Sequence, residues 1–414
     1  MKEHWRRTFL IIWSGQLISI LSSAVVGYAI IFWLSIETGS AEILAIAAIA
    51  AMLPQAVLGL FTGVYIDRWN RKLVMILSDC FIALCTLVLV ILFSVGKIEY
   101  WHIYLLAAAR SVGSAFHMPA MQASLPLLAP ESKLMRIAGV NQMIHSISAI
   151  GGPALGALLL AVLDMKYVLL FDIAGALFAA TTLLFVVIPN PEKSGKKKTP
   201  HVWNEMKESI AEIRKDKGLA FLFLFSVIAT FFIMPIAVMF PLMTINHFNG
   251  TVFHMSVVEV FWGAGMLAGG ALAGIKLHAG NKTLNLDELN KATLINYMYI
   301  IFGLTFFFSG ILSPAGFIWF VILTAIGGVS TSVYNASFTS LIQLKIDPAM
   351  LGRVFSVYMS FNYIPSMIGL LGTGFIADRI GLINAFIICG FVNFAIGLIS
   401  LMIPSIRRTG ISTL

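Results

Sequence analysis

Long uninterrupted apolar runs restrict most strongly how this chain can fold. The run from Leu219 to Met243, for example, contains no charged residue. An α-helix needs about 20 mostly apolar residues to cross the hydrocarbon core of a bilayer, whereas a membrane β-barrel shows short segments that alternate apolar and polar residues. Hydrophobic residues make up 59% of the 414 positions and charged residues only 11%, against about 25% charged in soluble proteins. The sequence therefore predicts an all-α integral membrane protein.

Charges, Gly/Pro pairs and polar clusters divide the apolar runs into two sets of six. The spans predicted before residue 189 are residues 9–34, 41–65, 73–95, 101–125, 137–161 and 167–188. The spans predicted after residue 218 are residues 219–245, 255–277, 292–312, 315–340, 354–377 and 382–404. We therefore expect an N-terminal six-helix bundle over residues 1–188, a linker with a surface helix over 189–218, and a C-terminal six-helix bundle over 219–414.

The interval 189–218 is the one extended polar stretch. Three consecutive lysines, 196–198, precede Met206, Ile210 and Ile213, which recur at helical spacing. Such a segment either tethers the two bundles or is drawn to anionic lipid headgroups. The tether is our preferred interpretation.

The distribution of cations predicts which side of the membrane each loop occupies. With the N-terminus in the cytoplasm, 23 of the 27 Lys and Arg residues fall in cytoplasmic segments. This excess sets the topology of membrane proteins, so we expect both termini in the cytoplasm and an even number of spans. The cations share no single face, so the net charge of +8 does not predict binding of nucleic acid.

Motifs for metal binding, ATP hydrolysis and catalysis are missing from the sequence. The three cysteines, Cys80, Cys85 and Cys389, lie in apolar runs without a C-x-x-C pair, so no metal site is predicted. Neither a nucleotide-binding Gly-x-x-x-x-Gly-Lys-Ser/Thr loop nor a His-Glu-x-x-His motif occurs, so we expect no catalytic residues and no cofactor. A membrane receptor or sensor is the alternative outside transport, although the interval 189–218 is short for a signalling domain.

A weak internal repeat relates the two halves. Residues 130–136 align with residues 347–353 at an offset of 217, which places His145 opposite Asn362. Because both halves begin on the same side, the repeat is parallel, and substrate sites of such transporters lie between the halves near the midplane. Hydrogen bonding between helices is the alternative role for the polar residues there. The candidates for lining a cavity are Gln16, Asn141, His145 and Asn362.

A cationic loop follows a small-residue face at the end of the second span. Gly59 and Gly63 are spaced as in the small-xxx-small pairs that let membrane helices approach closely. The loop is either a latch that opens and closes one side of the protein or a plain positive-inside loop. The residues of the predicted gating motif are Gly59, Gly63, Asp67, Arg68, Arg71 and Lys72.

Charged residues inside the spans are few. Such a group costs at least a few kcal/mol unless it is paired or hydrated, so it marks a functional site or a structural pair. Glu259 is our first candidate for proton coupling and Asp172 the second, with Arg110 as a possible charge partner; His145 also titrates in a useful range. Asp79 lies near the predicted cytoplasmic end of its helix, where we expect it to pair with the cations of the loop.

Three motifs resemble those of one family. The pattern Gly63-x-x-x-Asp67-Arg68-x-x-Arg71-Lys72 resembles the signature loop of the major facilitator superfamily, and residues 110–117 resemble its intramembrane arginine motif. Gly139, Gly152, Pro153 and Gly156 in the fifth span resemble its antiporter motif, with Ser148 and Ala157 at two places where glycine is usual. Over essentially the whole chain the best likeness is to macrolide-efflux-type exporters, in the drug:proton antiporter branch that also contains enterobactin exporters.

The resemblance implies both a fold and an activity. The implied fold has twelve transmembrane helices in two parallel-repeat six-helix bundles. The implied activity is proton-driven export of hydrophobic or amphipathic compounds, such as macrolide-like drugs, by alternating access in the bacterial cytoplasmic (inner) membrane. It needs a small-molecule substrate, protons, the lipid bilayer and no cofactor beyond the proton gradient, and we expect a functional monomer. A siderophore or lysophospholipid carrier of the same fold is the alternative.

Overall fold

A computed structural model describes residues 5–66, 69–128, 134–188, 202–274, 276–279, 282–285, 290–346 and 350–409. Within these residues, twelve helices have 20 residues or more. Ten of the described helices are long and apolar enough to cross a membrane. The other two, α4 and α13, are on average the least apolar of the twelve, because they carry many polar side chains. The predicted all-α membrane fold is confirmed.

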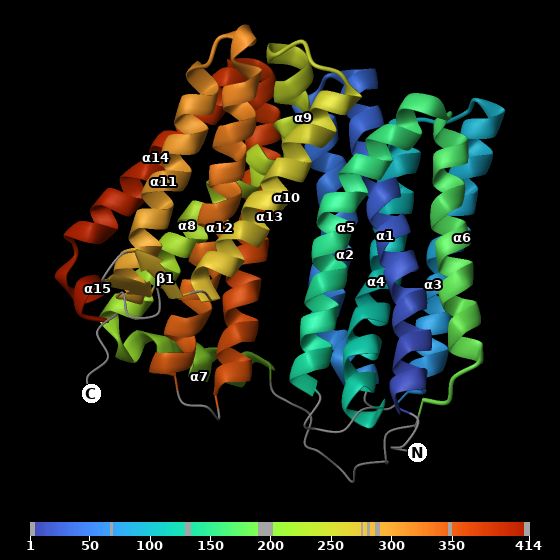
Figure 1. Ribbon diagram of the computed structural model, residues 1–414, viewed down its shortest axis with the longest axis horizontal. Helices are drawn as coiled ribbons and strands as arrows, with labels where there is room; N and C mark the ends of the chain where they lie inside the picture. Colours follow the sequence, from blue (N-terminus) through green and yellow to red (C-terminus); the bar gives the residue numbers. More distant parts are fainter. Residues whose placement is uncertain are drawn as a thin grey trace. The chain divides into compact units, whose positions relative to one another are not determined.

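The first compact unit consists of residues 1–39 and 46–197. Its helices, drawn in blue to green in Figure 1, are α1 (Trp5–Thr38), α2 (Ala41–Ile66) from residue 46 onward, α3 (Arg71–Val95), α4 (Tyr100–Leu128), α5 (Leu134–Val162) and α6 (Met165–Leu184). Helix α3 begins where the side chain of Asn70 accepts a hydrogen bond from the Leu73 N–H at 3.1 Å, and it ends at Gly96, whose φ of 67° is readily adopted by glycine.

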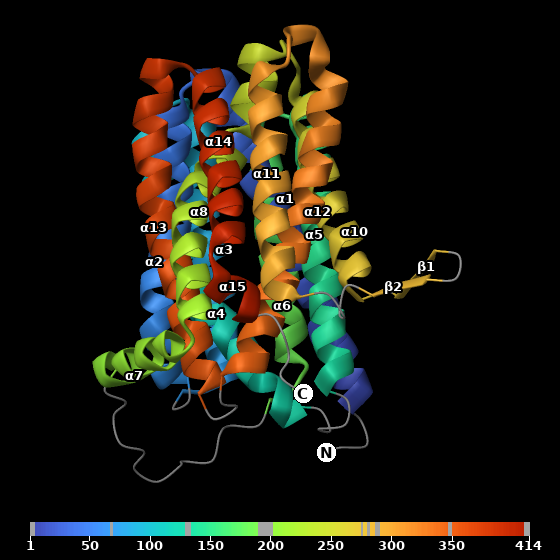
Figure 2. The ribbon, with the colours of Figure 1, turned by 90° about the vertical axis from the view of Figure 1, so that its left-hand side faces the viewer.

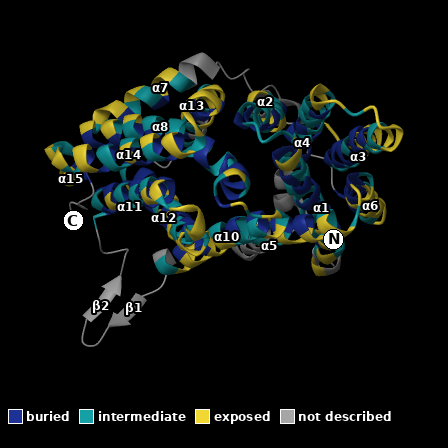
Figure 3. Ribbon diagram, turned by 90° about the horizontal axis from the view of Figure 1, so that it is seen from above, coloured by how far each residue is buried: buried dark blue, intermediate teal, exposed yellow. Residues whose placement is uncertain are grey.

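Glycines let α5 pack closely against α1. A Cβ atom at Gly156 would lie 2.9 Å from the Val25 carbonyl oxygen, and one at Gly152 would lie 3.0 Å from the Ala24 Cβ. Both contacts are tighter than ordinary van der Waals contact, so these two glycines of the predicted antiporter motif let α5 approach α1 closely. Large apolar side chains are exposed along α3 and α6, which suits helices that face lipid. Figure 3 shows the exposed residues of both helices in yellow.

The second compact unit consists of residues 40–45 and 198–414. Within it, the Asp378 carboxylate accepts hydrogen bonds from the Ser40 hydroxyl at 2.8 Å and the Ala41 N–H at 2.9 Å. Its long helices are α8 (Lys217–Val238), α10 (Val252–Gly274), α11 (Lys291–Ile311), α12 (Phe317–Lys345), α13 (Leu351–Ile380) and α14 (Leu382–Met402). The shorter elements are α7 (Val202–Lys215), α9 (Phe240–Leu242), the π-helical turn η3 (Met243–His247), β1 (Lys276–Ala279), β2 (Lys282–Asn285), the 3-10 turn η5 (Pro314–Gly316) and α15 (Pro404–Thr409).

The second unit departs from the predicted spans in two places. The run predicted as one helix over 219–245 is interrupted after Val238, since Pro241 lies in the first turn of α9 and the chain continues through a π-helical turn. Between α10 and α11 the chain forms an antiparallel hairpin in which Lys276 pairs with Asn285 (Figure 2). The sequence analysis did not anticipate this hairpin.

Helix α7 is the surface helix expected after the linker. Ile213 is only 5% exposed, and Met206 and Ile210 pack against the same apolar cluster of the second unit. The apolar side of α7 is therefore covered by protein. This packing agrees with the role of a tether better than with insertion into lipid headgroups.

The helix bounds repeat the offset of 217 found in the sequence. Helix α4 spans residues 100–128 and α12 spans 317–345, so both of their ends differ by 217. The same offset relates the first residues of α5 and α13, at 134 and 351, and those of α6 and α14, at 165 and 382. Residues of these helix pairs can therefore be compared position by position.

Candidate functional site

A buried ion pair joins two helices of the first unit. Arg110 on α4 places Nη2 3.0 Å from Oδ2 of Asp172 on α6. The Asp172 side chain is 0% exposed, whereas that of Arg110 is 15% exposed. Removing a carboxylate from water is costly unless another charge and hydrogen bonds compensate it. The two charges that the sequence singled out in this half therefore lie together.

Two hydroxyl groups complete the surroundings of the Asp172 carboxylate. Ser23 on α1 donates to Oδ1 at 2.5 Å, and Thr86 on α3 donates to Oδ2 at 2.6 Å. Three helices, α1, α3 and α4, thus contribute a polar group to one buried carboxylate of α6. Any change in its charge alters the interactions of all four helices at once.

A pocket of about 230 Å³ lies beside Arg110. Arg110, Ser111 and Ser114 of α4 form its polar wall, and apolar residues of α1, α2, α3 and α4 form the rest. This volume is large enough for several water molecules. The Arg110 guanidinium therefore has space outside the ion pair, which the Asp172 carboxylate does not have.

A second titratable pair lies between α3 and α4. His117 Nε2 is 3.3 Å from Asp79 Oδ1, and the two side chains are 9% and 4% exposed. We expected Asp79 to pair with the cations of the loop, but the structure places it against a histidine. The spacing was a usable signal: Asp79 and Thr86 on α3, and Arg110 and His117 on α4, are each seven residues apart and so share one face of their helix.

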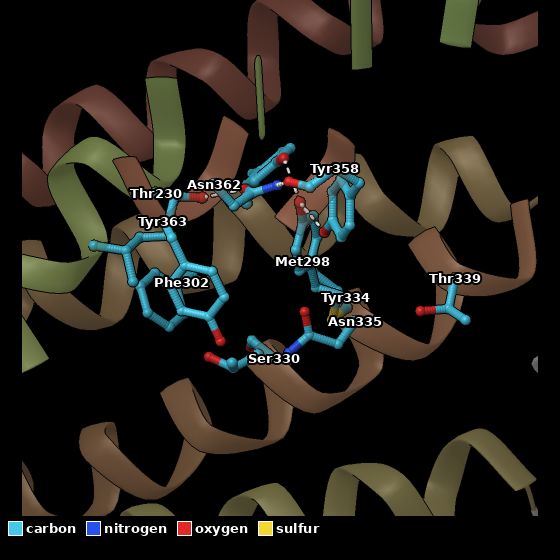
Figure 4. A pocket seen from close by; sticks show the side chains of 13 residues that line it. Thr230, Met298, Phe302, Ser330, Tyr334, Asn335, Thr339, Tyr358, Asn362 and Tyr363 are labelled. Carbon is cyan, nitrogen blue, oxygen red and sulfur yellow. Dashed lines mark hydrogen bonds between the residues drawn. The ribbon is translucent and has the colours of Figure 1, made fainter. Parts of the chain in front are cut away.

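A polar pocket of about 370 Å³ lies inside the second unit (Figure 4). Tyrosines from three helices, Tyr299 on α11, Tyr334 on α12 and Tyr358 on α13, contribute to its wall together with Asn362. The described residues that line it are all uncharged. The sequence analysis found Asn362 but missed the tyrosines.

Hydrogen bonds hold the polar groups of this pocket in place. Ser226 donates to Asn362 Oδ1 at 2.8 Å, and its Oγ lies 2.6 Å from the Tyr334 hydroxyl. The Tyr299 hydroxyl donates to Tyr334 at 3.2 Å, and Tyr358 lies 3.4 Å from it. Rings with neutral hydroxyl and amide groups suit ligands that are mainly apolar and carry a few polar groups.

The internal repeat shows a contrast between the two units. At the offset of 217, Arg110 corresponds to Gly327 and Asp172 to Cys389, while His117 corresponds to Tyr334. The first unit thus has ionisable residues where the second has a glycine, a thiol and a phenol. The Arg110–Asp172 ion pair thus lies in the first unit and the uncharged pocket in the second.

The remaining candidates for proton coupling and the cavity lie apart from these clusters. Glu259 on α10 and His145 on α5 are partly buried, and neither forms a hydrogen bond or ion pair with a described residue. Gln16 on α1 is fully buried, and its amide oxygen and nitrogen have no hydrogen-bond partner among the described residues. The side chain of Asn141 lies outside the described residues, as do the surroundings of Gly139.

The gating motif is described only in part. Asp67 and Arg68 lie outside the described residues, as do the surroundings of Gly59 and Gly63. Arg71 is buried, and Lys72 Nζ donates to the carbonyl oxygens of Leu184 and Val186, at 3.2 and 2.7 Å. Lys72 therefore connects the start of α3 to the end of α6, where a cation interacts favourably with the helix dipole.

Comparisons with known proteins identify the family and its relatives. The sequence profile described as Major Facilitator Superfamily matches residues 12–370. Macrolide efflux protein A of Streptococcus pyogenes is 38% identical over 406 residues, which cover 98% of each chain. Multidrug efflux pump Tap of Mycobacterium bovis is 25% identical over 91% of this chain and 88% of its own.

Solved structures share the fold at low sequence identity. The nucleoside transporter NupG matches 95% of this chain and 98% of its own, with a TM-score of 0.67 at 13% identity. A bacterial homolog of the human lysosomal transporter Spinster matches 99% and 98%, with the same TM-score of 0.67.

Proposed function

Since the chain belongs to the major facilitator superfamily and is thus a membrane transporter and not an enzyme, we propose that it exports amphipathic compounds in exchange for protons. Macrolides are the substrate class that we propose first, because macrolide efflux proteins match nearly the full length of the chain. The observation that carries the proton part is the fully buried Asp172 carboxylate paired with Arg110. Intramembrane ionisable groups of this kind mark proton relays in pumps and transporters.

The proton step is an exchange of partners at Asp172. When the carboxylate takes up a proton, its attraction to Arg110 is lost, and the guanidinium turns toward the adjoining pocket of about 230 Å³. The hydroxyl groups of Ser23 and Thr86 remain as partners of the neutral acid. Because α1, α3, α4 and α6 all contribute to this cluster, protonation shifts the balance between two arrangements of these helices. Glu259, which the sequence placed first, is the second candidate for the proton site in this proposal.

Substrate binds, in this proposal, in the tyrosine-lined pocket of the second unit. Its rings provide apolar contact area, while Tyr334 and Asn362 provide hydrogen-bonding groups of fixed orientation. Separating the proton and the substrate between the halves fits the contrast between Asp172 and its repeat counterpart Cys389. Each ligand then favours a different conformation, which gives alternating access with antiport.

The direction of transport follows from the proposed topology. With both termini in the cytoplasm, as the cation distribution predicts, protons enter from outside the inner membrane and drive substrate outward.

A transport assay tests the proposal. Purified protein in liposomes is given a radiolabelled macrolide and an imposed pH difference, and protein-free liposomes correct for the passive distribution of a weak base. We expect macrolide flux that stops when the pH difference is collapsed and that is lost in Asp172→Asn. The matched control is Asp164→Asn, because Asp164 lies just before the same helix and its side chain is 73% exposed.

The variants also separate the two proton sites. Loss of flux in Glu259→Gln, with flux retained in Asp172→Asn, would move the proton site to Glu259. Macrolide flux that ignores the pH difference would refute proton antiport. Flux of a siderophore or lysophospholipid in place of the macrolide would change the substrate class.

A further inference from the structure

A buried carboxylate–imidazole pair in the first unit is incompletely hydrogen-bonded. Asp79 Oδ2 is buried without a hydrogen bond to any described residue, and His117 Nε2 lies 3.3 Å from Asp79 Oδ1 without the geometry of a hydrogen bond. Nearly all buried polar atoms are hydrogen-bonded, so an exception needs a physical reason. A site that binds and releases a proton provides one, since its ideal hydrogen bonds exist in only one of its two states.

The position of this pair relates it to the Arg110–Asp172 pair. His117 follows Arg110 by seven residues on α4, and Asp79 precedes Thr86, which donates to Asp172, by seven residues on α3. Seven residues are two helical turns, or about 10 Å along the axis. Along α4, His117 thus lies two turns nearer the predicted cytoplasmic side than Arg110, and along α3 Asp79 lies two turns nearer that side than Thr86, the partner of Asp172.

We infer that Asp79 and His117 form a second proton-binding site, through which protons pass between Asp172 and the cytoplasm. The inference rests on the proposed proton antiport and adds the exit route to it. A distance of about 10 Å is too long for direct transfer, so the route needs intermediate groups. Ser114 lies four residues after Arg110 and three before His117, on the same face of α4, and it lines the pocket that Arg110 also lines. Water in this pocket and the Ser114 hydroxyl connect the two pairs.

The chemistry of the step is a simple proton transfer. A proton leaves an O–H bond of the relay and adds to the free lone pair of the His117 ring, which gives an imidazolium beside the Asp79 carboxylate. At the cytoplasmic side this N–H bond breaks and an O–H bond forms on water, so the ring is neutral again; the relay regains its proton from the Asp172 side. An aspartate beside the histidine stabilises the charged form during transfer.

Other ionisable groups are few around this pair. Apart from thiols, the described parts of the neighbouring helices carry six ionisable side chains near the Asp79–His117 pair. These are Arg71 and Lys72 at the start of α3, Arg110 on α4, Asp172 on α6, Arg6 at the start of α1 and His145 on α5. Lys72 is held by the carbonyl oxygens at the end of α6. Asp172 and Arg110 compensate each other. Among these groups only His145 is a further histidine, and it lies on α5 rather than between α3 and α4.

Two transport assays in the same liposomes distinguish a role of Asp79 and His117 in proton transfer from a structural role. Exchange of labelled for unlabelled macrolide at equal pH needs no net proton movement, whereas accumulation against a gradient needs a proton to cross in each cycle. In His117→Gln and Asp79→Asn we expect exchange close to that of the unchanged protein and a fall of about tenfold or more in pH-driven accumulation. The same-helix control is His102→Gln, because His102 lies in the first turn of α4 and accepts a hydrogen bond from the Glu99 N–H.

Each outcome decides the inference. If both variants accumulate macrolide like the unchanged protein, the second proton site is wrong while proton antiport stands. If exchange and accumulation fall together in both variants, Asp79 and His117 have a structural role and the inference is again wrong. If the unchanged protein exchanges macrolide but does not accumulate it in response to the pH difference, the proposed antiport is wrong, and so is the exit route.

Discussion

The buried ion pair between Arg110 and Asp172 predicts that replacing one partner lowers the stability of the protein more than replacing the other. At the observed 3.0 Å, and with an effective dielectric constant of about 20, the Coulomb attraction is about 5.5 kcal/mol. Removing one partner of such a buried pair destabilises a protein by about 3–5 kcal/mol, because the other charge is left uncompensated. The two partners differ, however, in what surrounds them.

In Arg110→Met, the Asp172 carboxylate stays fully buried and keeps only the hydroxyl groups of Ser23 and Thr86. In Asp172→Asn, the remaining guanidinium is 15% exposed and adjoins a pocket of about 230 Å³. We therefore expect the loss of stability to lie at the upper end of this range of about 3–5 kcal/mol for Arg110→Met, and at or below its lower end for Asp172→Asn. The double variant leaves no buried charge, and Asn still bonds to both hydroxyls, so its loss should be about 1–2 kcal/mol.

Thermal unfolding of the four purified proteins in one detergent measures this order. One heating rate is used throughout, since irreversible unfolding depends on it. For a unit of this size, about 5 kcal/mol corresponds to an apparent melting temperature lower by roughly 10 to 20 °C. The reasoning is refuted if Asp172→Asn is the less stable single variant, or if the double variant loses as much as both single variants together.

Three further predictions concern packing and the pocket of the second unit. Tyr334→Phe removes the hydroxyl that bonds to the serine and tyrosines of the pocket, so macrolide affinity should fall by roughly tenfold in a binding assay, whereas Tyr297→Phe, on an exposed part of α11, should bind normally. Gly303→Ala would place a Cβ against the backbone nitrogen of Phe394 on α14, so the melting temperature of this variant should fall by several degrees. An unchanged value would contradict the close packing of α11 and α14. Gly372→Ala has open space around its Cβ and serves as its control. Ile213→Ala should lower the melting temperature by a few degrees, because this α7 side chain is buried in the apolar cluster; a neutral result would mean that α7 does not dock there.

The long helices could be predicted because span length and charge placement are local properties of a membrane sequence. The predicted span 101–125 agrees with α4, Tyr100–Leu128, and the span 41–65 with α2, Ala41–Ile66. The hairpin of β1 and β2 was missed because each strand has only four residues and the predicted span 255–277 already included the first two residues of β1. The interruption after Val238 depends on Pro241, which a membrane helix can tolerate or not according to its neighbours.

The charged residues could be found in the sequence, but their pairing could not. An isolated charge in an apolar run is conspicuous, so Arg110, Asp172 and Glu259 were all candidates. Which of them meet depends on helix rotation and packing, which a single sequence does not determine. The tyrosine pocket was missed for another reason: tyrosine is common in membrane helices, and only the fold brings Tyr299, Tyr334 and Tyr358 together.

The neutral character of the tyrosine pocket has a consequence for the chemistry of compounds that it would accept. The described walls of that pocket hold no fixed ion, so dissolved salt has little to screen and ionic strength should leave ligand affinity nearly constant. A pocket with such walls selects ligands by their size and by the positions of their hydroxyl groups. An antibiotic would then escape recognition more readily through added bulk than through an altered charge.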